Sequence, residues 1–277
     1  MEHVDFRRLL RSESLDLLFP GWEKGESIAF LSPHDDDILL GAGYILCSTI
    51  QNGGIPHVFI FSGGDAGYSI PEEKNSIVER RKEEAVRAYI ALGVSKENIH
   101  FFGLTDFSVM PYVNRHPPSG RGIFEDLVRM FRGKKISRVV FSSGYFENWD
   151  HSAVFNIGMY VVPQAGDAVL ADLGKTHPVK TFLIYSVWAD FEPREDERTC
   201  IRADYGVLAG EKQEAKVMEA IDIFSSQRAI IEDIVSHRKR RRTSEGYLEL
   251  YKDAGLRQPI EYAPYFSLLR KCKKSFT

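Results

Sequence analysis

The sequence predicts an α/β fold, because short apolar runs alternate along the chain with segments of helical spacing. The runs are rich in Val, Ile and Phe, as is typical of strands buried on both faces of a sheet. Parallel strands need crossover connections, and the helical segments between the runs can supply them. We therefore expect a Rossmann-like three-layer αβα sandwich with a mostly parallel sheet and helices on both faces. The runs are 27–31, 58–61, 99–102, 138–141 and 182–185, and the helical segments are 38–51, 76–92, 122–131 and 151–161.

A C-cap glycine marks the end of one predicted helix, and the chain becomes richer in charged residues after the last apolar run. Gly93 follows the helical segment 76–92 in the position of a C-cap glycine. Residues 189–204 are crowded with charge, and 211–224 has the spacing of a further amphipathic helix. The expected organisation is a single domain over 1–277, with a helical N-terminal extension at 1–25 and C-terminal cap elements at 190–277.

Composition argues against several classes of protein. Of 277 residues, 43% are hydrophobic and 27% are charged, which rules out a disordered or collagen-like chain. The formal charge is −3, which argues against nonspecific electrostatic binding to nucleic acid. The cysteines Cys47, Cys200 and Cys272 lie far apart and form no CxxC pair, so neither a disulfide framework nor a cysteine zinc site is indicated. A cytoplasmic location is the expectation.

No membrane span is expected either. The N-terminus mixes acids and bases before any apolar stretch, so no secretory signal is predicted. Segment 38–64 has no charged residue, but 51–54 and Pro56 divide it into pieces too short for a bilayer of about 30 Å. The basic run 237–242 is interpreted as a solvated helix face or loop rather than a contact with nucleic acid or anionic lipid.

The loop after the first predicted strand is a candidate metal site. Ligands bind at the carboxyl ends of the strands in an open parallel sheet, and there His34 precedes Asp35, Asp36 and Asp37. Adjacent carboxylates repel one another unless a cation lies among them or they cap a helix. One capping Asp is commonplace, but three beside an imidazole exceed what a cap needs. The loop therefore indicates a bound metal.

The loop after the fourth predicted strand adds a second imidazole at the same edge of the sheet. Segment 142–153 contains Asp150 and His151. Two His side chains and one carboxylate, with a position open to water, form a catalytic divalent-metal site that most often holds zinc.

Two other enzyme classes fail at the motif level. A dinucleotide fingerprint at Gly41 and Gly43 needs a third glycine where Leu46 stands, and no GxSxG elbow of a serine hydrolase is present. The glycine-rich segment 62–67 can approach a ligand closely, but alone it is a weak signal.

Five motifs follow one another in order between residues 27 and 155. They are His34-Asp35-Asp36-Asp37, 61–67, 80–84 leading to 92–94, 102–106 and 149–153, with a weaker echo at Ser226-Gln227. This series resembles the PIG-L / LmbE-like family of zinc-dependent N-deacetylases. The shared order and spacing are specific for the family, but they do not specify a substrate.

The resemblance implies roles in the first loop. In the family motif His-Pro-Asp-Asp-Glu, the His and the second Asp bind zinc and the first Asp is the general base. This implies His34 and Asp37 as ligands and Asp36 as the base. Asp35 stands in the proline place and Ile38 in the glutamate place, and these changes spare the metal-binding atoms.

The second family motif, His-Pro-Asp-His, implies His151 as the third ligand. Its first His, which assists the transition state, is replaced by Asn148, which can donate a hydrogen bond but cannot transfer a proton. Asp150, which supports that His in the family, would orient either Asn148 or the metal ligand. Candidates for the missing polar helper are Tyr145, Tyr262 and His116.

The resemblance also implies that Arg81 and Asp106 meet the hydroxyls of a sugar. The alternatives are a helix ion pair of Arg81 with Glu83 or Glu84 and a simple turn aspartate at position 106.

The resemblance thus implies an enzyme that uses Zn²⁺, or another divalent metal, to remove an acetyl group from an N-acetylglucosamine-type sugar or sugar conjugate. Oligomeric assembly is left open. One alternative is a hydrolase of a different N-acyl or ester bond, because a hydrolytic zinc centre does not choose its acyl group. The other, suggested by Asn148, is a catalytically silent protein that binds sugars or nucleotides.

Overall fold

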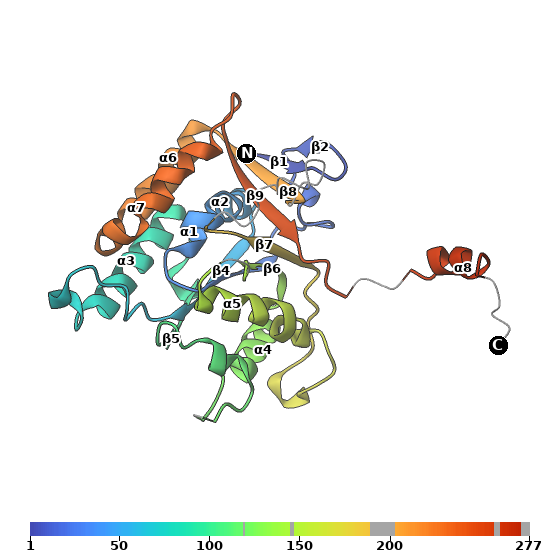
Figure 1. The fold of residues 1–277 in the computed structure, drawn as a ribbon, viewed down its shortest axis with the longest axis horizontal. Helices are drawn as coiled ribbons and strands as arrows, with labels where there is room; N and C mark the ends of the chain where they lie inside the picture. The colour runs from blue at the N-terminus through green and yellow to red at the C-terminus, as the bar shows by residue number, and fades with distance from the viewer. Residues whose placement is uncertain (119, 145–146, 189–202, 258–260, 273–277) are drawn as a thin grey trace.

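Within the part of the chain that the structure describes, nine strands form one mixed sheet in the order β2-β1-β8-β9-β7-β6-β3-β4-β5 (Figure 1). A computed structural model of the chain describes residues 1–118, 120–144, 147–188, 203–257 and 261–272. The strands are β1 (Glu2–Asp5), β2 (Leu10–Ser12), β3 (Ser27–Ser32), β4 (Ile55–Ser62), β5 (Ile99–Leu104), β6 (Ile136–Ser142), β7 (Thr181–Tyr185), β8 (Tyr205–Ala209) and β9 (Tyr247–Asp253). The α-helices are α1 (Asp37–Gly41), α2 (Gly43–Gln51), α3 (Ile77–Leu92), α4 (Phe124–Gly133), α5 (Trp149–Asn156), α6 (Glu211–Asp222), α7 (Arg228–His237) and α8 (Ala263–Leu269).

The five predicted strands are confirmed as the parallel half of the sheet, β7-β6-β3-β4-β5. The chain leaves β3 for β4 and β5 on one side and then returns to β6 on the other side of β3. The carboxyl ends of β3 and β6 therefore lie next to each other where the direction of winding reverses. Loops at such a switch point diverge and leave a crevice for a ligand.

The other half of the sheet is antiparallel, so the expectation of a mostly parallel sheet is wrong. Four of the eight strand pairings among the described residues are antiparallel, and all four involve β1, β2, β8 or β9. The helical extension expected at 1–25 is also wrong, because β1 and β2 lie there. In β1, buried His3 and Asp5 alternate with partly exposed neighbours, which is the period of a strand.

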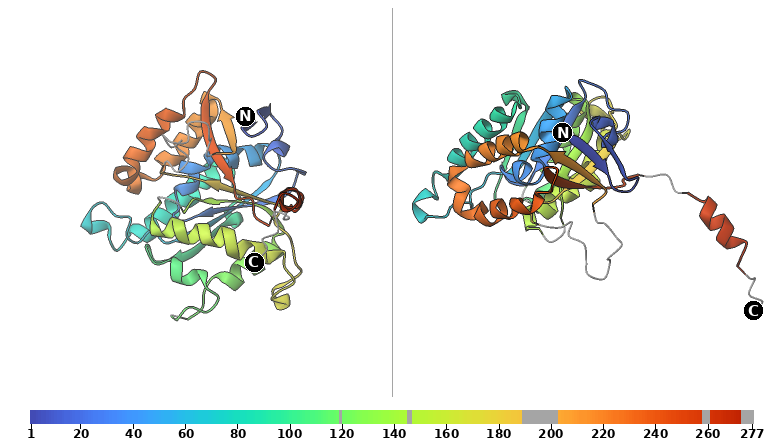
Figure 2. Two further views of the ribbon diagram at one scale, coloured as in Figure 1. Left: turned by 45° about the vertical axis from the view of Figure 1, so that its right-hand side comes forward. Right: turned by 90° about the horizontal axis from the view of Figure 1, so that it is seen from above.

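The expected C-terminal cap elements include two strands of this sheet. β8 pairs with β1 and β9, and β9 also pairs with β7, which joins the two halves. The parts of the expected cap at 190–202, 258–260 and 273–277 lie outside the described residues. α8 stands away from the body of the molecule (Figure 2).

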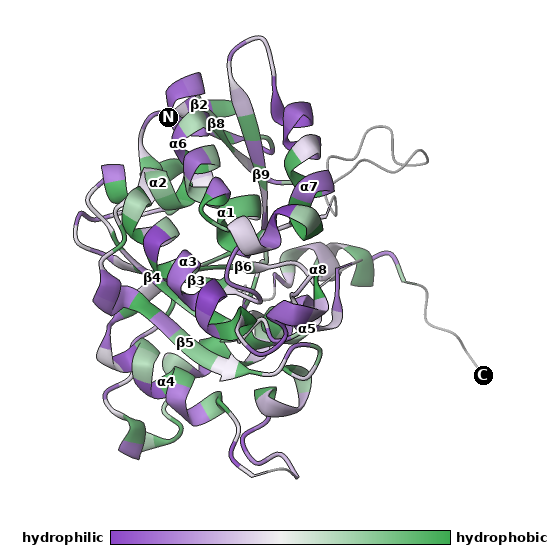
Figure 3. Ribbon diagram, turned by 90° about the vertical axis from the view of Figure 1, so that its left-hand side faces the viewer, coloured by the Kyte–Doolittle hydropathy of each residue, from purple (hydrophilic) through white to green (hydrophobic). Residues whose placement is uncertain are grey.

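Each face of the sheet packs against its own set of helices. In β3, Ile28 and Phe30 point to one apolar cluster, and Ala29 and Leu31 point to the other. The first cluster contains side chains of α1, α2, α3, α6 and α7, and the second contains those of α4 and α5. Figure 3 shows α1 and α2 as predominantly hydrophobic, consistent with their almost complete burial.

The single helix expected at 38–51 is divided into α1 and α2 at Ala42, whose backbone leaves helical geometry at φ −141°. A Cβ atom on Gly41 would lie 2.4 Å from Tyr185 Cδ2, and one on Gly43 would lie 2.8 Å from Val217 Cγ1. The two glycines therefore allow β7 and α6 to approach the break. They serve packing and not the binding of a dinucleotide.

Among the described residues, none of the helices has both the length and the apolar character needed to cross a membrane.

Candidate metal centre

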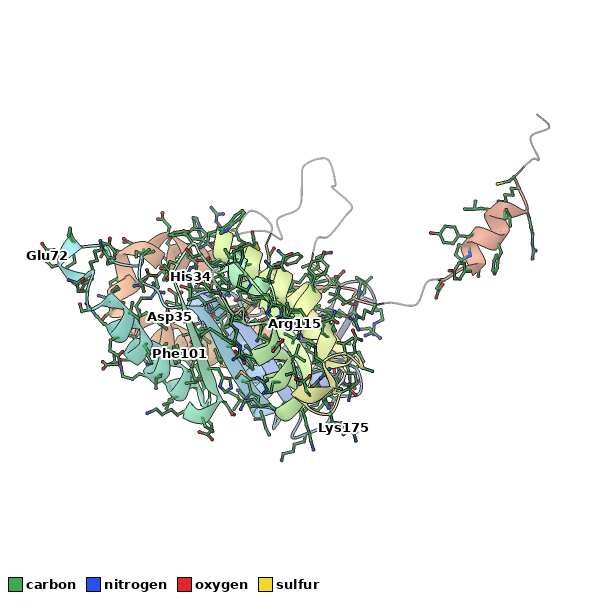
Figure 4. The ribbon with its side chains drawn as sticks, turned by 90° about the horizontal axis from the view of Figure 1, so that it is seen from below. His34, Asp35, Glu72, Phe101, Arg115 and Lys175 are labelled. Carbon is green, nitrogen blue, oxygen red and sulfur yellow. The ribbon has the colours of Figure 1, made fainter. Side chains whose placement is uncertain are left out.

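A cavity of about 180 Å³ lies at the carboxyl ends of β3 and β6. Figure 4 shows His34 and Asp35 inside the molecule, whereas Glu72 and Lys175 lie at its edge. All the predicted site residues except Asp150 line the cavity: His34, Asp36, Asp37, Arg81, Asp106, Asn148 and His151. Residues far apart in the sequence are thus brought to the switch point.

His34, Asp37 and His151 present one ligand atom each to a common point. Asp37 Oδ2 lies 3.2 Å from His34 Nδ1 and 3.3 Å from His151 Nε2. The three ligand atoms all lie within 4.8 Å of one another. A tetrahedral zinc with bonds of about 2.0–2.1 Å places its ligand atoms roughly 3.3 Å apart. The two short separations match this spacing, so the three residues fit a metal ion.

The first loop folds to aim its side chains by local hydrogen bonds. The backbone N–H of His34 donates to Asp37 Oδ2 at 2.7 Å, which turns the chain between β3 and α1. Asp36 occupies the N-cap position of α1, but its side chain makes no capping hydrogen bond. Helix capping therefore does not account for Asp36, whose carboxylate lines the cavity instead.

Asn148 organises the second loop. Its side-chain Oδ1 accepts hydrogen bonds from the backbone N–H groups of Asp150 at 2.9 Å and His151 at 3.0 Å. Asn148 is therefore the N-cap of α5, and this cap holds His151 in the first turn of the helix.

Burial and mutual attraction shift the pKa values of the three residues. Burial alone would raise the pKa of Asp37, but the charge of His151 and hydrogen bonds from both imidazoles hold it well below its usual range. Burial opposes a charged imidazole, yet hydrogen bonds to Asp150 and Asp37 raise the pKa of His34 well above its ordinary value. Asp37 and Glu147 likewise outweigh burial and raise the pKa of His151 to about 9. The carboxylates therefore favour positive charge on both imidazoles, in spite of burial.

Asp36 differs from Asp37 in its surroundings, although both are buried. Burial, together with the negative charges of Asp35 and Asp37, raises the pKa of Asp36 to about 7, and the nearby guanidinium of Arg81 opposes this rise. The distance from Arg81 Nη2 to Asp36 Oδ1 is 3.7 Å.

Asp150 lies behind the cavity and contacts a metal-ligand candidate. Its Oδ2 lies 3.5 Å from His34 Nε2, and its carboxylate accepts hydrogen bonds from the backbone N–H groups of Phe107 at 2.6 Å and Val109 at 3.3 Å. Of the two partners considered for Asp150, the contact is with the ligand side chain His34. With Nε2 facing Asp150, Nδ1 of His34 is the atom that faces Asp37.

Arg81 meets neither of the helix partners considered for it. Its Nε donates to both carboxylate oxygens of Asp35, at 3.1 and 3.0 Å, and its Nη1 donates to Gln227 Oε1 at 2.7 Å. No ion pair between described residues joins it to Glu83 or Glu84. The residue in the family's proline place therefore pairs with this arginine.

Asp106 has the contacts of a turn aspartate and also lines the cavity. Its carboxylate accepts hydrogen bonds from the backbone N–H groups of Gly64 at 3.0 Å and Ala66 at 2.9 Å. These bonds hold the glycine-rich segment after β4 against the end of β5. Asp106, Asp150 and His34 form a second possible ligand group, but both carboxylates already accept backbone hydrogen bonds.

Sequence reasoning missed Glu147, whose Oε2 lies 3.1 Å from His151 Nδ1. A Glu four residues before the ligand was visible in the sequence, but nothing there showed which way its side chain would point. The proposed polar helpers Tyr262 and His116 do not line the cavity, and Tyr145 lies outside the described residues.

The basic run is only partly solvated, contrary to its interpretation from the sequence. Arg238 is 3% exposed, and its Nη2 donates to Glu214 at 2.6 Å. Arg241 donates to Glu249 at 2.6 Å and to the backbone oxygen of Leu40 at 2.6 Å. These two arginines neutralise buried acids inside the molecule.

Comparisons with solved structures show that this fold recurs. A structure of N,N′-diacetylchitobiose deacetylase from Pyrococcus horikoshii is 17% identical, with a TM-score of 0.69 over 87% of this chain and 86% of that one. A conserved protein from Thermus thermophilus is 19% identical, with a TM-score of 0.63 over 86% and 97%. The 4-carboxy-2-hydroxymuconate hydratase GalB from Pseudomonas putida KT2440 is 20% identical, with a TM-score of 0.61 over 86% and 100%.

No curated protein matches the chain. The family model PIG-L, described as GlcNAc-PI de-N-acetylase, matches residues 29–162, which include both loops of the metal centre. Over this segment the chain is similar to the PIG-L family.

Proposed function

We propose that the chain is a metal-dependent hydrolase that removes the acetyl group from the nitrogen of an N-acetylated sugar or sugar conjugate. The observation that carries the proposal is the convergence of His34 Nδ1, His151 Nε2 and Asp37 Oδ2. The family description and the diacetylchitobiose deacetylase of the same fold support an acetamido sugar of the N-acetylglucosamine type as the substrate.

Zinc is the metal that we propose for the site, held by His34, Asp37 and His151. Two imidazole nitrogens and one carboxylate oxygen are typical of catalytic zinc, although other divalent metals accept the same ligands. When bound, such a metal supplies a Lewis acid for the amide carbonyl and lowers the pKa of a water molecule.

Asp36 is the group that we propose as the general base. It lines the cavity beside the ligand triad, and its carboxylate makes no helix-capping bond that would compete with a substrate or water. In this proposal the carboxylate takes a proton from the attacking water and returns it to the leaving nitrogen. Acetate and a free amine are the products.

Asn148 and Arg81 are positioned to bind and not to transfer protons. Both hydrogen bonds accepted by Asn148 Oδ1 come from the start of α5, so its amide N–H groups are the polar atoms left to meet an oxyanion in the cavity. The guanidinium of Arg81, held by Asp35 and Gln227, is proposed to meet the sugar hydroxyls together with Asp106.

The test is release of free amine from a panel of acetylated sugars by zinc-reconstituted protein, with D36N as the matched control. We expect amine release from at least one N-acetylglucosamine derivative and a large loss in D36N. A metal-loaded protein that releases no amine from any acetamido sugar would contradict the proposal.

Two alternatives have specific support. The hydratase of the same fold shows that this architecture also carries chemistry other than deacetylation, so the panel should include other N-acyl amides and esters. A silent binding protein, suggested by Asn148, would bind acetylated sugars without turnover. A cytoplasmic location and a single domain over 1–277 stay predictions.

A further inference from the structure

We propose that Glu147 is a positioning residue of the metal centre, which fixes the tautomer of His151 and ties this ligand to the loop after β7. The inference rests on the metal site of the proposed function and not on the identity of the substrate. Glu147 precedes α5, and its side chain is completely buried.

One oxygen of Glu147 is fully occupied by the loop that follows β7. Oε1 accepts hydrogen bonds from Ser186 Oγ at 2.8 Å, from the backbone N–H of Val187 at 3.0 Å and from that of Trp188 at 3.2 Å. With three donors on this oxygen, the other oxygen is the atom left for a further partner. Oε2 is therefore a second acceptor, and it needs a donor of its own.

The imidazole of His151 supplies that donor. Glu147 Oε2 and His151 Nδ1 are both buried, and neither has a partner that meets the geometric criteria for a hydrogen bond. The two atoms lie 3.1 Å apart. A buried polar atom almost always has a partner, and the 3.1 Å separation puts each of these two atoms within reach of the other. A proton on Nδ1 satisfies both atoms.

The proton on Nδ1 determines what the other side of the ring presents. A metal ion at this site would need the second ring nitrogen, Nε2, without a proton, and Nε2 lies 3.3 Å from Asp37 Oδ2, which is also an acceptor. Two acceptors at this separation repel each other unless a proton or a metal ion lies between them. Glu147 thus prepares His151 to be a metal ligand, as Asp150 does for His34 through Nε2.

Glu147 also connects this ligand to the wall of the cavity. Trp188, whose backbone N–H binds Oε1, lines both the metal cavity and a neighbouring cavity of about 370 Å³. The same carboxylate therefore sets the direction of the ligand and the position of a wall residue.

The loop after β7 and His151 each need an acceptor from the side chain at position 147, so the matched variant is E147Q. A glutamine has the same shape but only one acceptor. If its oxygen faces the loop, its NH₂ group opposes the Nδ1–H of His151; if its oxygen faces His151, its NH₂ group opposes three donors. S186A is the control, because it removes one bond to Oε1 and leaves the contact between Oε2 and His151 in place.

The experiment measures zinc affinity of the full chain by competition with a chromophoric chelator, together with the visible spectrum after Co²⁺ loading. We expect E147Q to bind zinc about 10- to 100-fold more weakly and to change the Co²⁺ spectrum. S186A should keep an affinity and a spectrum close to those of the wild type. Circular dichroism of the metal-free proteins checks that E147Q is folded.

The outcomes separate this proposal from the proposed function. Folded E147Q with wild-type zinc affinity and an unchanged Co²⁺ spectrum would overturn the role of Glu147 alone. Wild-type protein that binds no divalent metal would overturn both proposals. Wild-type protein that binds zinc but hydrolyses no acetamido sugar would overturn only the proposed function.

Discussion

Two buried charged clusters lie at opposite ends of the short helix α1, and their buried carboxylates have different kinds of partner. At its N-terminus, Asp37 faces the imidazoles of His34 and His151. At its C-terminus, Arg238 and Arg241 donate to the backbone oxygen of Leu40. We call these the metal cluster (His34, Asp36, Asp37, His151) and the arginine cluster (Glu214, Arg238, Arg241, Glu249).

The arginine cluster contains its own cations. Arg238 pairs with Glu214, and Arg241 pairs with Glu249, each at 2.6 Å. Both guanidinium groups also bind carbonyl oxygens at the end of α1, where positive charge is favoured. Every charge there has a protein partner, which is the condition for a structural cluster.

In the metal cluster, the partners of Asp37 are imidazoles, which can exchange a proton for a metal ion. Asp37 faces two imidazole nitrogens, and each imidazole has its other nitrogen directed to an outer carboxylate, Asp150 or Glu147. The lesson is that burial of charge does not by itself mark a site. A site is indicated where potential ligand atoms converge on one point and the partners of the buried carboxylate are imidazoles instead of guanidinium groups.

The largest expected effect is loss of a metal ligand. Replacing His34 or His151 by Ala removes one of three ligands, so we expect loss of stoichiometric zinc and a fall of amide hydrolysis by several orders of magnitude, to the uncatalysed background. Metal analysis and amine release measure the two effects. An active variant that keeps no metal would contradict the assignment of the site.

Replacement of the proposed base, Asp36, should lower turnover without loss of the bound metal. D36N leaves the three ligands intact, so zinc should remain while turnover falls about 10²- to 10⁴-fold. Steady-state amine release by the zinc-loaded variant is the measurement. A near-native rate would place the base elsewhere.

In the arginine cluster, the equivalent substitution should affect stability and not metal. R238A leaves Glu214 buried without its partner, and we expect the free energy of unfolding to fall by about 3–5 kcal/mol. R242A, an exposed arginine of the same run, is the control and should change it by less than about 0.5 kcal/mol. Chemical denaturation measures both. Loss of zinc from folded R238A would contradict the separation of the two clusters.

The smallest expected effect is the pH dependence of the arginine cluster. Burial alone would raise the pKa of Glu214, but its hydrogen bond and ion pair with Arg238 lower it below the ordinary 4.5. The stabilisation is therefore complete above pH 4.5 and disappears as the pH falls through the lowered pKa. The difference in unfolding free energy between wild type and E214Q should shrink on acidification. A constant difference down to about pH 2 would show that the pair does not titrate this way.

The same contrast explains what the sequence could and could not predict. The strands β3 to β7 were predictable, because continuous apolar runs have one stable place, a sheet covered on both faces. β9 was not predictable, because its Glu249 is typical of a solvated position but is buried with Arg241, Tyr44 and Tyr251 as partners. The N-terminal strand β1 was missed because its buried positions are His3 and Asp5 and not apolar residues.

The site was predictable to the extent that sheet topology places loops. The loops after β3 and β6 had to meet at one edge, so His34, Asp37 and His151 could be brought together from the sequence. The partners of those ligands could not, because the direction of a loop carboxylate such as Glu147 depends on the later loop at Ser186–Trp188.

The most direct test of the central claim is the zinc content of purified, reconstituted protein, measured side by side for wild type, H151A and R238A. The account predicts one zinc per chain in the wild type and in folded R238A, and none in H151A. Equal zinc in the wild type and H151A, or none in the wild type, would contradict it.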